Sequence, residues 1–489
     1  IIAAAFCRIF RQDGYHPVPF KAQNMALNSY ATPEGLEIGR AQAVQAEAAG
    51  VPCHTDMNPL LLKPSSDHTS QVVLNGRPIG NRSAYEYFRV EGREELRHEV
   101  CSAFDRLASR YNPIVMEGAG SISEINLRDT DLVNLPMALH AGADVILVGD
   151  IDRGGVFASV YGSLMLLRPY ERERIKGILI NKFRGDIRLF ESGVKMLEEL
   201  CGIPVVGVVP YYKDIYIEEE DSLALATKSV QTEQGKVNIA VVLLRHLSNF
   251  TDFNVLERDP RVHLFYTNNV DELAKADIIL LPGSKSTLAD LHELRRNGVA
   301  QAVIRAHREG ATVMGIWGGY QIMGQEVCDP DHVEGEIERL PGLGLLPVST
   351  HMTGEKITRQ IKFRLSAVAR ENSHLFTDGM QANLEGYEIH MGTTVPVYDA
   401  PVSPLNLLED GGADGYFLDR TCIGTYIHGI LDNPSFIDFL LEPFADKIAD
   451  AGKSFDYHQF KEEQYNKLAD HVRSHVDLPL IYKILTTHD

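Results

Sequence analysis

The chain of 489 residues carries 47 lysines and arginines against 67 aspartates and glutamates, a formal net charge of −20. Its length predicts two or three domains, each with its own core. So acidic a chain repels phosphate backbones and anionic lipids, which argues against nucleic acid or a membrane surface as its main partner. The six scattered cysteines contain no CxxC pair. Together with the absence of an apolar run near membrane-spanning length, this predicts a cytoplasmic protein with reduced thiols.

Short β-branched runs alternate with helical stretches along the whole chain. The opening residues 1–14 predict an amphipathic helix rather than a signal peptide, because arginines interrupt the apolar run. Strands of the buried type are predicted at 16–20, 113–117, 144–150, 175–181, 204–210, 238–244, 277–283 and 311–316. Such strands, separated by helices, are typical of parallel sheets covered on both faces, so the predicted fold class is α/β.

The domain organisation follows from one change in composition. Residues 226–237 are polar and show no hydrophobic period, which predicts a linker between two α/β domains, at 1–225 and 238–445. Apolar residues recur at helical spacing within residues 446–489, which predicts a helical tail that packs back on one of the domains.

Three predicted strands of the first domain end in polar residues. Glu117 follows one strand, Asp150 and Asp152 follow another, and Asn181 and Lys182 end a third. Ligands of open α/β sheets gather at the carboxyl ends of strands, so we expect a nucleotide site with Mg²⁺ on a carboxylate. Each strand end, taken alone, is equally compatible with a solvated acidic turn.

A series of motifs gives the chain a specific resemblance: FKAQNMALNS (20–29), EIGRAQAVQA (37–46), MNPLLLKP (57–64), EGAGSISEINLRD (117–129), DIDRGGVFAS (150–159), NKFRGD (181–186) and EEDSL (219–223). Over its whole length the chain resembles the cobyric acid synthase family, glutamine-dependent amidotransferases of cobalamin biosynthesis. The family's first half is similar to dethiobiotin synthetase, a P-loop fold. The resemblance implies that ATP phosphorylates the b, d, e and g carboxylates of adenosylcobyrinic acid a,c-diamide and that ammonia displaces each phosphate.

For the nucleotide, the resemblance implies that Glu117 lies on the Mg²⁺ side of the site, with Glu37 as a second metal candidate. Asn181 corresponds to the residue that reads adenine, since an amide offers a donor and an acceptor, and Lys182 lies beside it. The family's Gly-rich loop, ending in Gly-Lys-Ser/Thr, would precede Ile1. Because that loop supplies phosphate-binding N–H groups, a lysine and a Mg²⁺ ligand, the sequence as written predicts weak MgATP binding.

For the acceptor, the resemblance places four side chains where the corrinoid carboxylate and the acyl phosphate belong: Lys21, Gln23, Asn24 and Asn28. Lys21 could neutralise the negative charge that develops there. For Asn24 and Asn28, ordinary turn chemistry is the alternative.

The segment ATVMGIWGGYQIMG (311–324) predicts a strand, a sharp turn flanked by glycines and a helix, which is the form of a nucleophile elbow. The family pattern resembles GICGGYQ, with a cysteine whose thiolate attacks glutamine. Here the only tryptophan of the chain, Trp317, stands at that position. Indole is no nucleophile at neutral pH, so we expect Trp317 to block the thioester, fill the glutamine pocket and strain the elbow. A natural or engineered substitution, a sequence error and a paralogue without glutaminase activity stay open as its origin.

The remaining parts of a glutaminase site are present. Gly283 in LPGSKST and Gly318 after the elbow are the candidates for oxyanion N–H groups. His428 in GTYIHGILD matches the family's general base, a role that suits histidine because imidazole titrates near neutral pH. Most glutaminases carry a glutamate two residues later, and this chain has an isoleucine there. HLSNFTDF (246–253) resembles a family signature without an assigned role.

Two other functions remain open at this point. Cobyrinic acid a,c-diamide synthase is a near relative, although FKAQNMALNS, SNFTDF and EGAGSISEINLRD favour cobyric acid synthase. The elbow tryptophan is also compatible with a non-catalytic corrinoid-binding or regulatory homologue. The expected partners are ATP, Mg²⁺, the corrinoid, and glutamine or ammonia, and the oligomeric state is left open.

Overall fold

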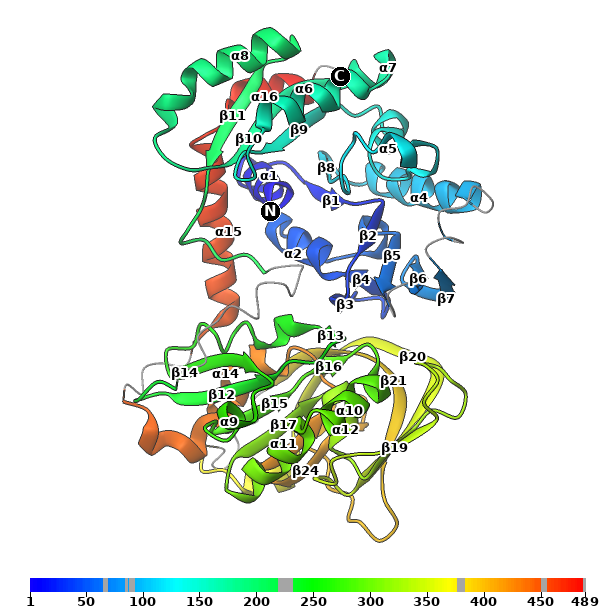
Figure 1. Cartoon of the computed structure of the whole chain (residues 1–489), viewed down its shortest axis with the longest axis vertical. Helices are drawn as coiled ribbons and strands as arrows, with labels where there is room; N and C mark the ends of the chain where they lie inside the picture. Colours follow the sequence, from blue (N-terminus) through cyan, green and yellow to red (C-terminus); the bar gives the residue numbers. More distant parts are fainter. Residues whose placement is uncertain are drawn as a thin grey trace.

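The protein consists of two α/β parts, which Figure 1 shows one above the other. The computed structural model describes residues 1–64, 69–83, 87, 93–218, 232–375, 383–449 and 455–486. We call residues 1–218 the N-terminal half, residues 232–449 the C-terminal half and residues 455–486 the tail. The EEDSL motif (219–223) and residues 226–231 of the predicted linker lie outside the described residues. Within the described ranges, no helix has the length and apolar character needed to cross a membrane.

The main strands of the N-terminal half form two parallel groups. β1 (Val18–Phe20) pairs with β8 (Ile114–Met116), and β10 (Ile175–Phe183) lies between β9 (Val145–Asp150) and β11 (Val205–Pro210). The strands predicted in this half are therefore confirmed, and they are parallel as expected. The helices between them are α1 (Ile2–Gln12), α2 (Arg40–Ala49), α4 (Arg93–Ala108), α5 (Leu135–His140), α6 (Val156–Leu166), α7 (Pro169–Arg172) and α8 (Glu191–Cys201).

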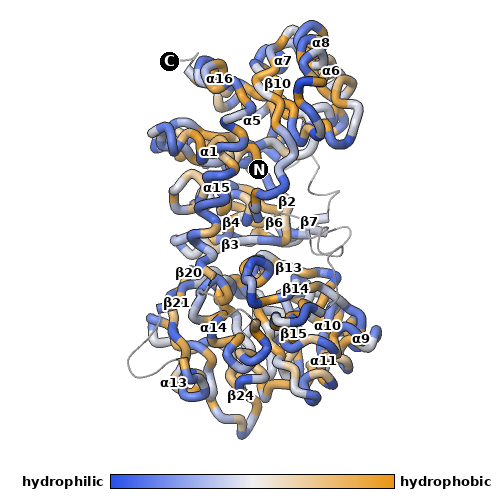
Figure 2. The backbone as a smooth tube through the Cα atoms, turned by 90° about the vertical axis from the view of Figure 1, so that its left-hand side faces the viewer, coloured by the Kyte–Doolittle hydropathy of each residue, from blue (hydrophilic) through white to orange (hydrophobic). Residues whose placement is uncertain are grey.

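A second, smaller sheet of the N-terminal half faces the C-terminal half. Its strand order is β2 (Gln23–Met25), β5 (Leu60–Pro64), β6 (Thr69–Leu74) and β7 (Arg77–Ser83), and the short pair β3 (Ser29–Ala31) and β4 (Glu37–Gly39) lies beside it. These strands were not predicted from the sequence, and three of the six, β2, β3 and β4, are only three residues long. In Figures 1 and 2, β3 lies at the junction, next to β13 (Leu247–Ser248) and β20 (Val348–Leu365) of the C-terminal half.

The C-terminal half is built on one six-stranded sheet, in the order β14 (Val262–Thr267), β12 (Val237–Val242), β15 (Ile278–Leu281), β17 (Thr312–Ile316), β25 (Cys422–Thr425) and β24 (Tyr416–Asp419). Only β24 is antiparallel. The predicted strands are again present, and β12, β15 and β17 are completely buried. The helices are α9 (Val270–Leu273), α10 (Thr287–Arg296), α11 (Val299–Arg308), α12 (Gly318–Met323), α13 (Ala367–Glu371) and α14 (Pro434–Leu441).

A second sheet of this half carries a long antiparallel pair, β20 with β21 (Leu384–Pro396). Burial alternates along β20, which exposes many charged residues, so the sequence lacks the apolar run by which the other strands were predicted. The remaining strands of this sheet are short: β18 (Glu326–Cys328), β19 (Arg339–Pro341), β22 (Asn406–Leu408) and β23 (Ala413–Asp414).

The predicted helical tail consists of α15 (Tyr457–Arg473) and α16 (Leu478–Leu485). In Figure 1, α15 runs in red along the side of the molecule from the C-terminal half to the N-terminal half. Its apolar face packs on α1, with Leu468 and Val472 in one buried cluster with Ile9. The predicted amphipathic first helix is therefore buried on the side that the tail covers.

Candidate active site

The elbow has the predicted geometry of strand, tight turn and helix. Trp317 lies between β17 and α12 with φ 51° and ψ −113°, a conformation that costs a bulky residue about 1–3 kcal/mol. A Cβ atom on Gly319 would lie 1.9 Å from the carbonyl oxygen of Leu281, and one on Gly318 would lie 2.8 Å from the backbone nitrogen of Ser284. The two glycines are therefore required for the close approach of the helix to the neighbouring strand.

The indole of Trp317 fills the space between the candidate oxyanion strand and the candidate base. Its side chain is buried, with the residue 6% exposed. A Cβ atom on Gly283 would lie 2.5 Å from Cε3 of the indole. The ring also meets the imidazole of His428 edge to face, with centroids 5.6 Å apart. The indole thus occupies the space between Gly283 and His428.

The structure brings the two candidate oxyanion glycines to one place. Gly283 lies in β16 (Gly283–Ser284), which pairs with β13, and Gly318 begins α12. The close approach of Gly318 to the Ser284 nitrogen makes the two segments neighbours beside Trp317.

His428 is completely buried and is held in one orientation. Its Nδ1 donates to Oδ2 of Asp252 at 2.7 Å, and the other carboxylate oxygen accepts the N–H of Gly429 at 3.2 Å. Its ring stacks on Tyr387 at 5.2 Å. Nε2 is buried and has no hydrogen-bond partner among the described residues. A carboxylate on Nδ1 and an unengaged Nε2 are what a general base requires.

Asp252 was not among the site residues predicted from the sequence. It lies in the short helix η5 (Phe250–Phe253), within the HLSNFTDF motif, and is 4% exposed. This carboxylate gives Nδ1 of His428 an acidic partner, which Ile430, two residues after the histidine, cannot provide. The motif itself was visible in the sequence, but Asp252 and His428 are 176 positions apart and only the fold brings them together.

A second polar cluster forms at the end of β8. Nζ of Lys21 lies 3.0 Å from Oε1 of Glu117, and Nε2 of Gln45 donates to Oε2 at 2.5 Å. Although burial alone would raise the pKa of Glu117, the ammonium of Lys21 lowers it below its usual value. The carboxylate therefore stays charged next to a cation, at the strand end where the sequence predicted a ligand site.

The four candidate acceptor residues do not all meet at this cluster. Asn24 is buried and donates to Oε1 of Gln42 at 3.1 Å, so it faces the same helix, α2, as the Lys21 cluster. Gln23 lies on the opposite face of β2 and accepts from the hydroxyl of Tyr87 at 2.6 Å. Asn28 is buried further along the chain, where its carbonyl accepts the N–H of Arg40 at 3.1 Å. The glutamines of α2 were part of a quoted motif, but sequence analysis gave them no role.

The candidate adenine-binding residues form a separate group. Asn181 is the register partner of Asp150 on the neighbouring strand. Lys182 has φ 61°, and its Nζ lies 2.9 Å from Oδ2 of Asp150. Its backbone nitrogen donates to the Asn181 side chain at 2.9 Å. The polar ends of β9 and β10 therefore meet at one place in this sheet.

Glu37 does not join Glu117. It is fully buried at the junction of the halves, where its carboxylate accepts Nζ of Lys63 at 2.7 Å and Nζ of Lys356 from β20. Burial alone would raise the pKa of Glu37, but the two lysines lower it well below its usual range. Both oxygens are engaged, so these surroundings do not fit a metal ligand. Across the described ranges, no group of three or more His, Cys, Asp or Glu is placed to hold a metal ion. Glu117 fits Mg²⁺ only as one ligand beside phosphate oxygens.

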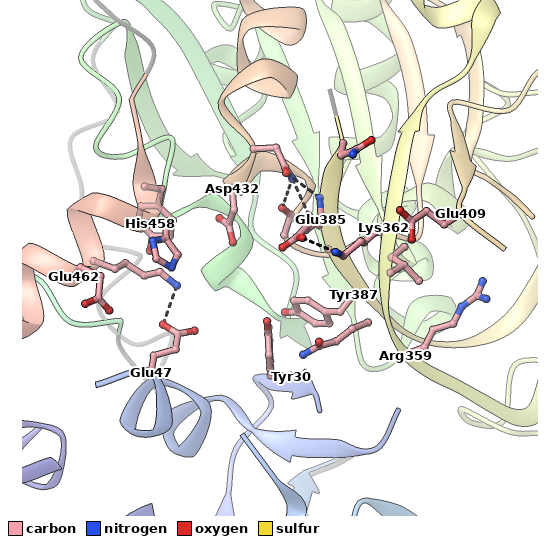
Figure 3. Close-up of a pocket in the computed structure, with 18 of the residues that line it drawn as sticks. Tyr30, Glu47, Arg359, Lys362, Glu385, Tyr387, Glu409, Asp432, His458 and Glu462 are labelled. Atoms are coloured by element: carbon pink, nitrogen blue, oxygen red, sulfur yellow. Dashed lines mark hydrogen bonds and ion pairs between the residues drawn. The ribbon is translucent and has the colours of Figure 1, made fainter. Parts of the chain in front are cut away.

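A cavity of about 1240 Å³ lies between the two halves and the tail. Figure 3 shows Tyr30 from the N-terminal half facing Tyr387 of β21. Glu47, also labelled there, accepts from Nζ of Lys461 in the tail at 2.9 Å. Asp432, four positions after His428, also lines the cavity. Because Tyr387 stacks on His428, its ring separates this cavity from the base.

Two family models match separate parts of the chain. Residues 1–224 match the family model of the CobQ/CobB/MinD/ParA nucleotide binding domain, and residues 238–436 match that of the CobB/CobQ-like glutamine amidotransferase domain. A solved structure described as PurLQS from Thermotoga maritima aligns with a TM-score of 0.32 at 18% identity, covering 43% of this chain and 99% of that chain.

Relatives named cobyric acid synthase match the chain from end to end. A cobyric acid synthase of Bacteroides fragilis is 82% identical over 489 residues, which cover 100% of this chain and 96% of the relative. One from Phocaeicola vulgatus is 73% identical over the same length and shares. The chain belongs to the cobyric acid synthase family of glutamine-dependent amidotransferases.

Proposed function

We propose that this chain amidates the b, d, e and g carboxylates of adenosylcobyrinic acid a,c-diamide at the cost of ATP, and that it takes its nitrogen from free ammonia. The family supports the reaction class. One observation supports ammonia as the nitrogen source: the indole of Trp317 occupies the space between Gly283 and His428.

In the acceptor reaction, a carboxylate oxygen of the corrinoid attacks the γ-phosphorus of ATP, and the bond from that phosphorus to ADP breaks. Ammonia then attacks the carbonyl carbon of the acyl phosphate, phosphate leaves with the C–O bond electrons, and the nitrogen loses a proton that the phosphate takes up. Lys21 neutralises the charge that gathers on the transferred group, held in place by Glu117 at 3.0 Å. Asn181 and Lys182 contribute the adenine side of the nucleotide site. Mg²⁺, when bound with Glu117 as one ligand, withdraws charge from the phosphate oxygens.

In the C-terminal half, His428 has the surroundings of a general base, but the nucleophile position is held by Trp317. His428 has Asp252 on Nδ1 and a buried Nε2 without a partner among the described residues. Glutamine hydrolysis in this class of enzyme requires a thioester, and indole carbon and nitrogen atoms do not form one. Glutamine therefore supplies no ammonia in this chain.

The experiment compares nitrogen sources. The protein, expressed from its entire gene, is incubated with ATP, Mg²⁺, the corrinoid a,c-diamide and either ¹⁵N-ammonium or ¹⁵N-amide glutamine. We expect ¹⁵N amides by mass spectrometry from ammonium and none from glutamine. Absence of the ammonium product would contradict the acceptor proposal, and product from glutamine would contradict the nucleophile argument.

A matched pair of variants locates the acceptor site. Lys21→Met removes the cation beside Glu117 and should lower ammonium-driven amidation by about 10²–10³-fold, the typical cost of losing one charge-stabilising group. Lys176→Met removes an exposed lysine from β10 and should leave the rate unchanged. Equal rates in the two variants would refute the role given to Lys21.

A further inference from the structure

One short segment of the C-terminal half, residues 247–253, contacts the N-terminal half on one side and the base on the other. The hydroxyl of Ser248 donates to the carbonyl of Leu27 at 2.8 Å, and Oδ1 of Asn249 accepts the N–H of Ser29 at 3.1 Å. Three positions later, Asp252 holds Nδ1 of His428. The end of the FKAQNMALNS motif and the HLSNFTDF motif, both singled out in the sequence, therefore touch each other.

A chain of aromatic rings makes a second connection to the same histidine. Tyr30, the residue after Ser29, meets Tyr387 edge to face at 4.5 Å, across the junction drawn in Figure 3. Tyr387 stacks on His428, and the backbones of these two residues exchange hydrogen bonds of 2.8 and 3.0 Å. The hydroxyl of Tyr387 also donates to the carbonyl of Ser29 at 3.4 Å.

The conformation of Asn249 fits a role in this connection. Its φ of 54° lies in the left-handed region, which costs most residues energy but which asparagine tolerates better than most. The residue is 2% exposed. The strained turn at Asn249 therefore places its Oδ1 against the N-terminal half and leaves η5 aimed at His428.

We propose that Asn249 and Tyr387 are positioning residues, through which residues 27–30 of the N-terminal half hold the base His428 in its working orientation. These residues directly follow the segment of Lys21 and Asn24. Glutamine hydrolysis in an enzyme with a cysteine at the elbow then depends on a correctly docked acceptor half. This consequence for catalysis rests on the proposed function, whereas the positioning of His428 can be measured without it.

The first test uses the protein with its own tryptophan. Trp317 is the single tryptophan of the chain and packs on His428, so its emission spectrum and its quenching by acrylamide report on this ring. Asn249→Gly removes Oδ1 but suits the left-handed turn, and Asn249→Asp keeps the acceptor. Gln360→Ala is the matched control, because it removes another hydrogen bond between the halves, from Nε2 to the carbonyl of Ala31 at 2.9 Å.

We expect Asn249→Gly to change the emission and to increase the quenching of Trp317, and Asn249→Asp and Gln360→Ala to keep the parental values. Parental fluorescence in Asn249→Gly would overturn the proposal. An equal change in Gln360→Ala would overturn it too, because the effect would then come from docking in general.

The second test uses kinetics in the Trp317→Cys background. Asn249→Gly should lower kcat for glutamine hydrolysis about tenfold at unchanged KM, in line with a typical coupling between sites, and should spare amidation from ammonium. Tyr387→Leu should lower this kcat to a similar extent, whereas Tyr387→Phe, which keeps the ring, should lower it much less. Equal loss of both reactions in Asn249→Gly would refute positioning. Absence of ammonium-driven amidation in the parent would count against the proposed function alone, while the fluorescence result still decides the positioning.

Discussion

Replacing Trp317 by cysteine should convert the chain into a glutaminase. The variant places a thiol at the tip of the elbow, next to a base that already has its carboxylate, since Asp252 lies 2.7 Å from Nδ1 of His428. In a comparable triad, loss of the nucleophile costs on the order of 10⁶ in kcat. Because the other parts of the site are in place, we expect glutamate release to rise by on the order of 10⁴-fold or more.

Trp317→Cys should also destabilise the folded protein, because the indole is buried. Trp317 is 6% exposed, and truncating a buried tryptophan typically destabilises a protein by about 3–5 kcal/mol. The positive φ at the elbow persists with cysteine, so no strain is relieved. The vacated space borders Nε2 of His428, which has no partner among the described residues, so water can enter and find a hydrogen bond. We therefore expect a loss of about 3 kcal/mol, near the lower end of that range.

Two measurements check this prediction, glutamate release with glutamine as the only nitrogen source and the free energy of unfolding in urea. Trp317→Ala is the control, since it opens the same space without a nucleophile. The reasoning is refuted if the alanine variant hydrolyses glutamine as fast as the cysteine variant. It is equally refuted if the cysteine variant is folded, amidates from ammonium and yet releases no glutamate.

Three further predictions concern charge and orientation. Glu37→Gln should leave Lys63 and Lys356 without a compensating charge and lower the free energy of unfolding by about 3–5 kcal/mol. The control Lys362→Gln, in an exposed ion pair, should cost at most about 1 kcal/mol, and similar urea midpoints for both variants would contradict the prediction. In the cysteine variant, Asp252→Asn should lower glutaminase kcat by about 10⁴-fold, because the amide no longer fixes the tautomer of His428, and an unchanged kcat would exclude that role. Burial lowers the pKa of His390 to about 4, so the unfolded chain binds more protons than the folded chain between pH 4 and 6.5, and the free energy of unfolding should fall by about 3 kcal/mol as the pH drops through this range. Urea titrations at pH 4 and pH 7 should show this pH-dependent loss in the parent, and His390→Phe, which keeps the stack on Tyr426, should abolish it.

The sequence revealed the parallel sheets because their strands are continuous apolar runs. β12 and β17, for example, are buried at every position, so both faces of each strand select apolar residues. The antiparallel elements gave no such signal. β20 alternates between buried and exposed positions, and its charged residues face the junction or solvent rather than a core. Its partner β21 could not be matched to it without the fold.

The residues of the candidate site were also predictable only where they lie close together in the sequence. Trp317 and its glycines could be found because the elbow is local, a strand, a turn and a helix within fourteen residues of sequence. Lys21 and Glu117, in contrast, are 96 positions apart, and their ion pair depends on β1 and β8 lying side by side. Glu37 looked like a free carboxylate because its partner Lys356 comes from the other half of the chain, 319 positions away.

The position of Glu37 also explains why the two halves meet in one register. An apolar junction could slide at little cost, but Glu37 is buried between one lysine of its own half and Lys356 of the other. A shift of a few ångströms would separate these charges inside the protein, which is strongly unfavourable. The ion pair therefore contributes less to overall stability than to the choice of a single docked arrangement. That arrangement is the one in which Ser29 meets Asn249, and so the buried charges and the orientation of His428 depend on the same junction.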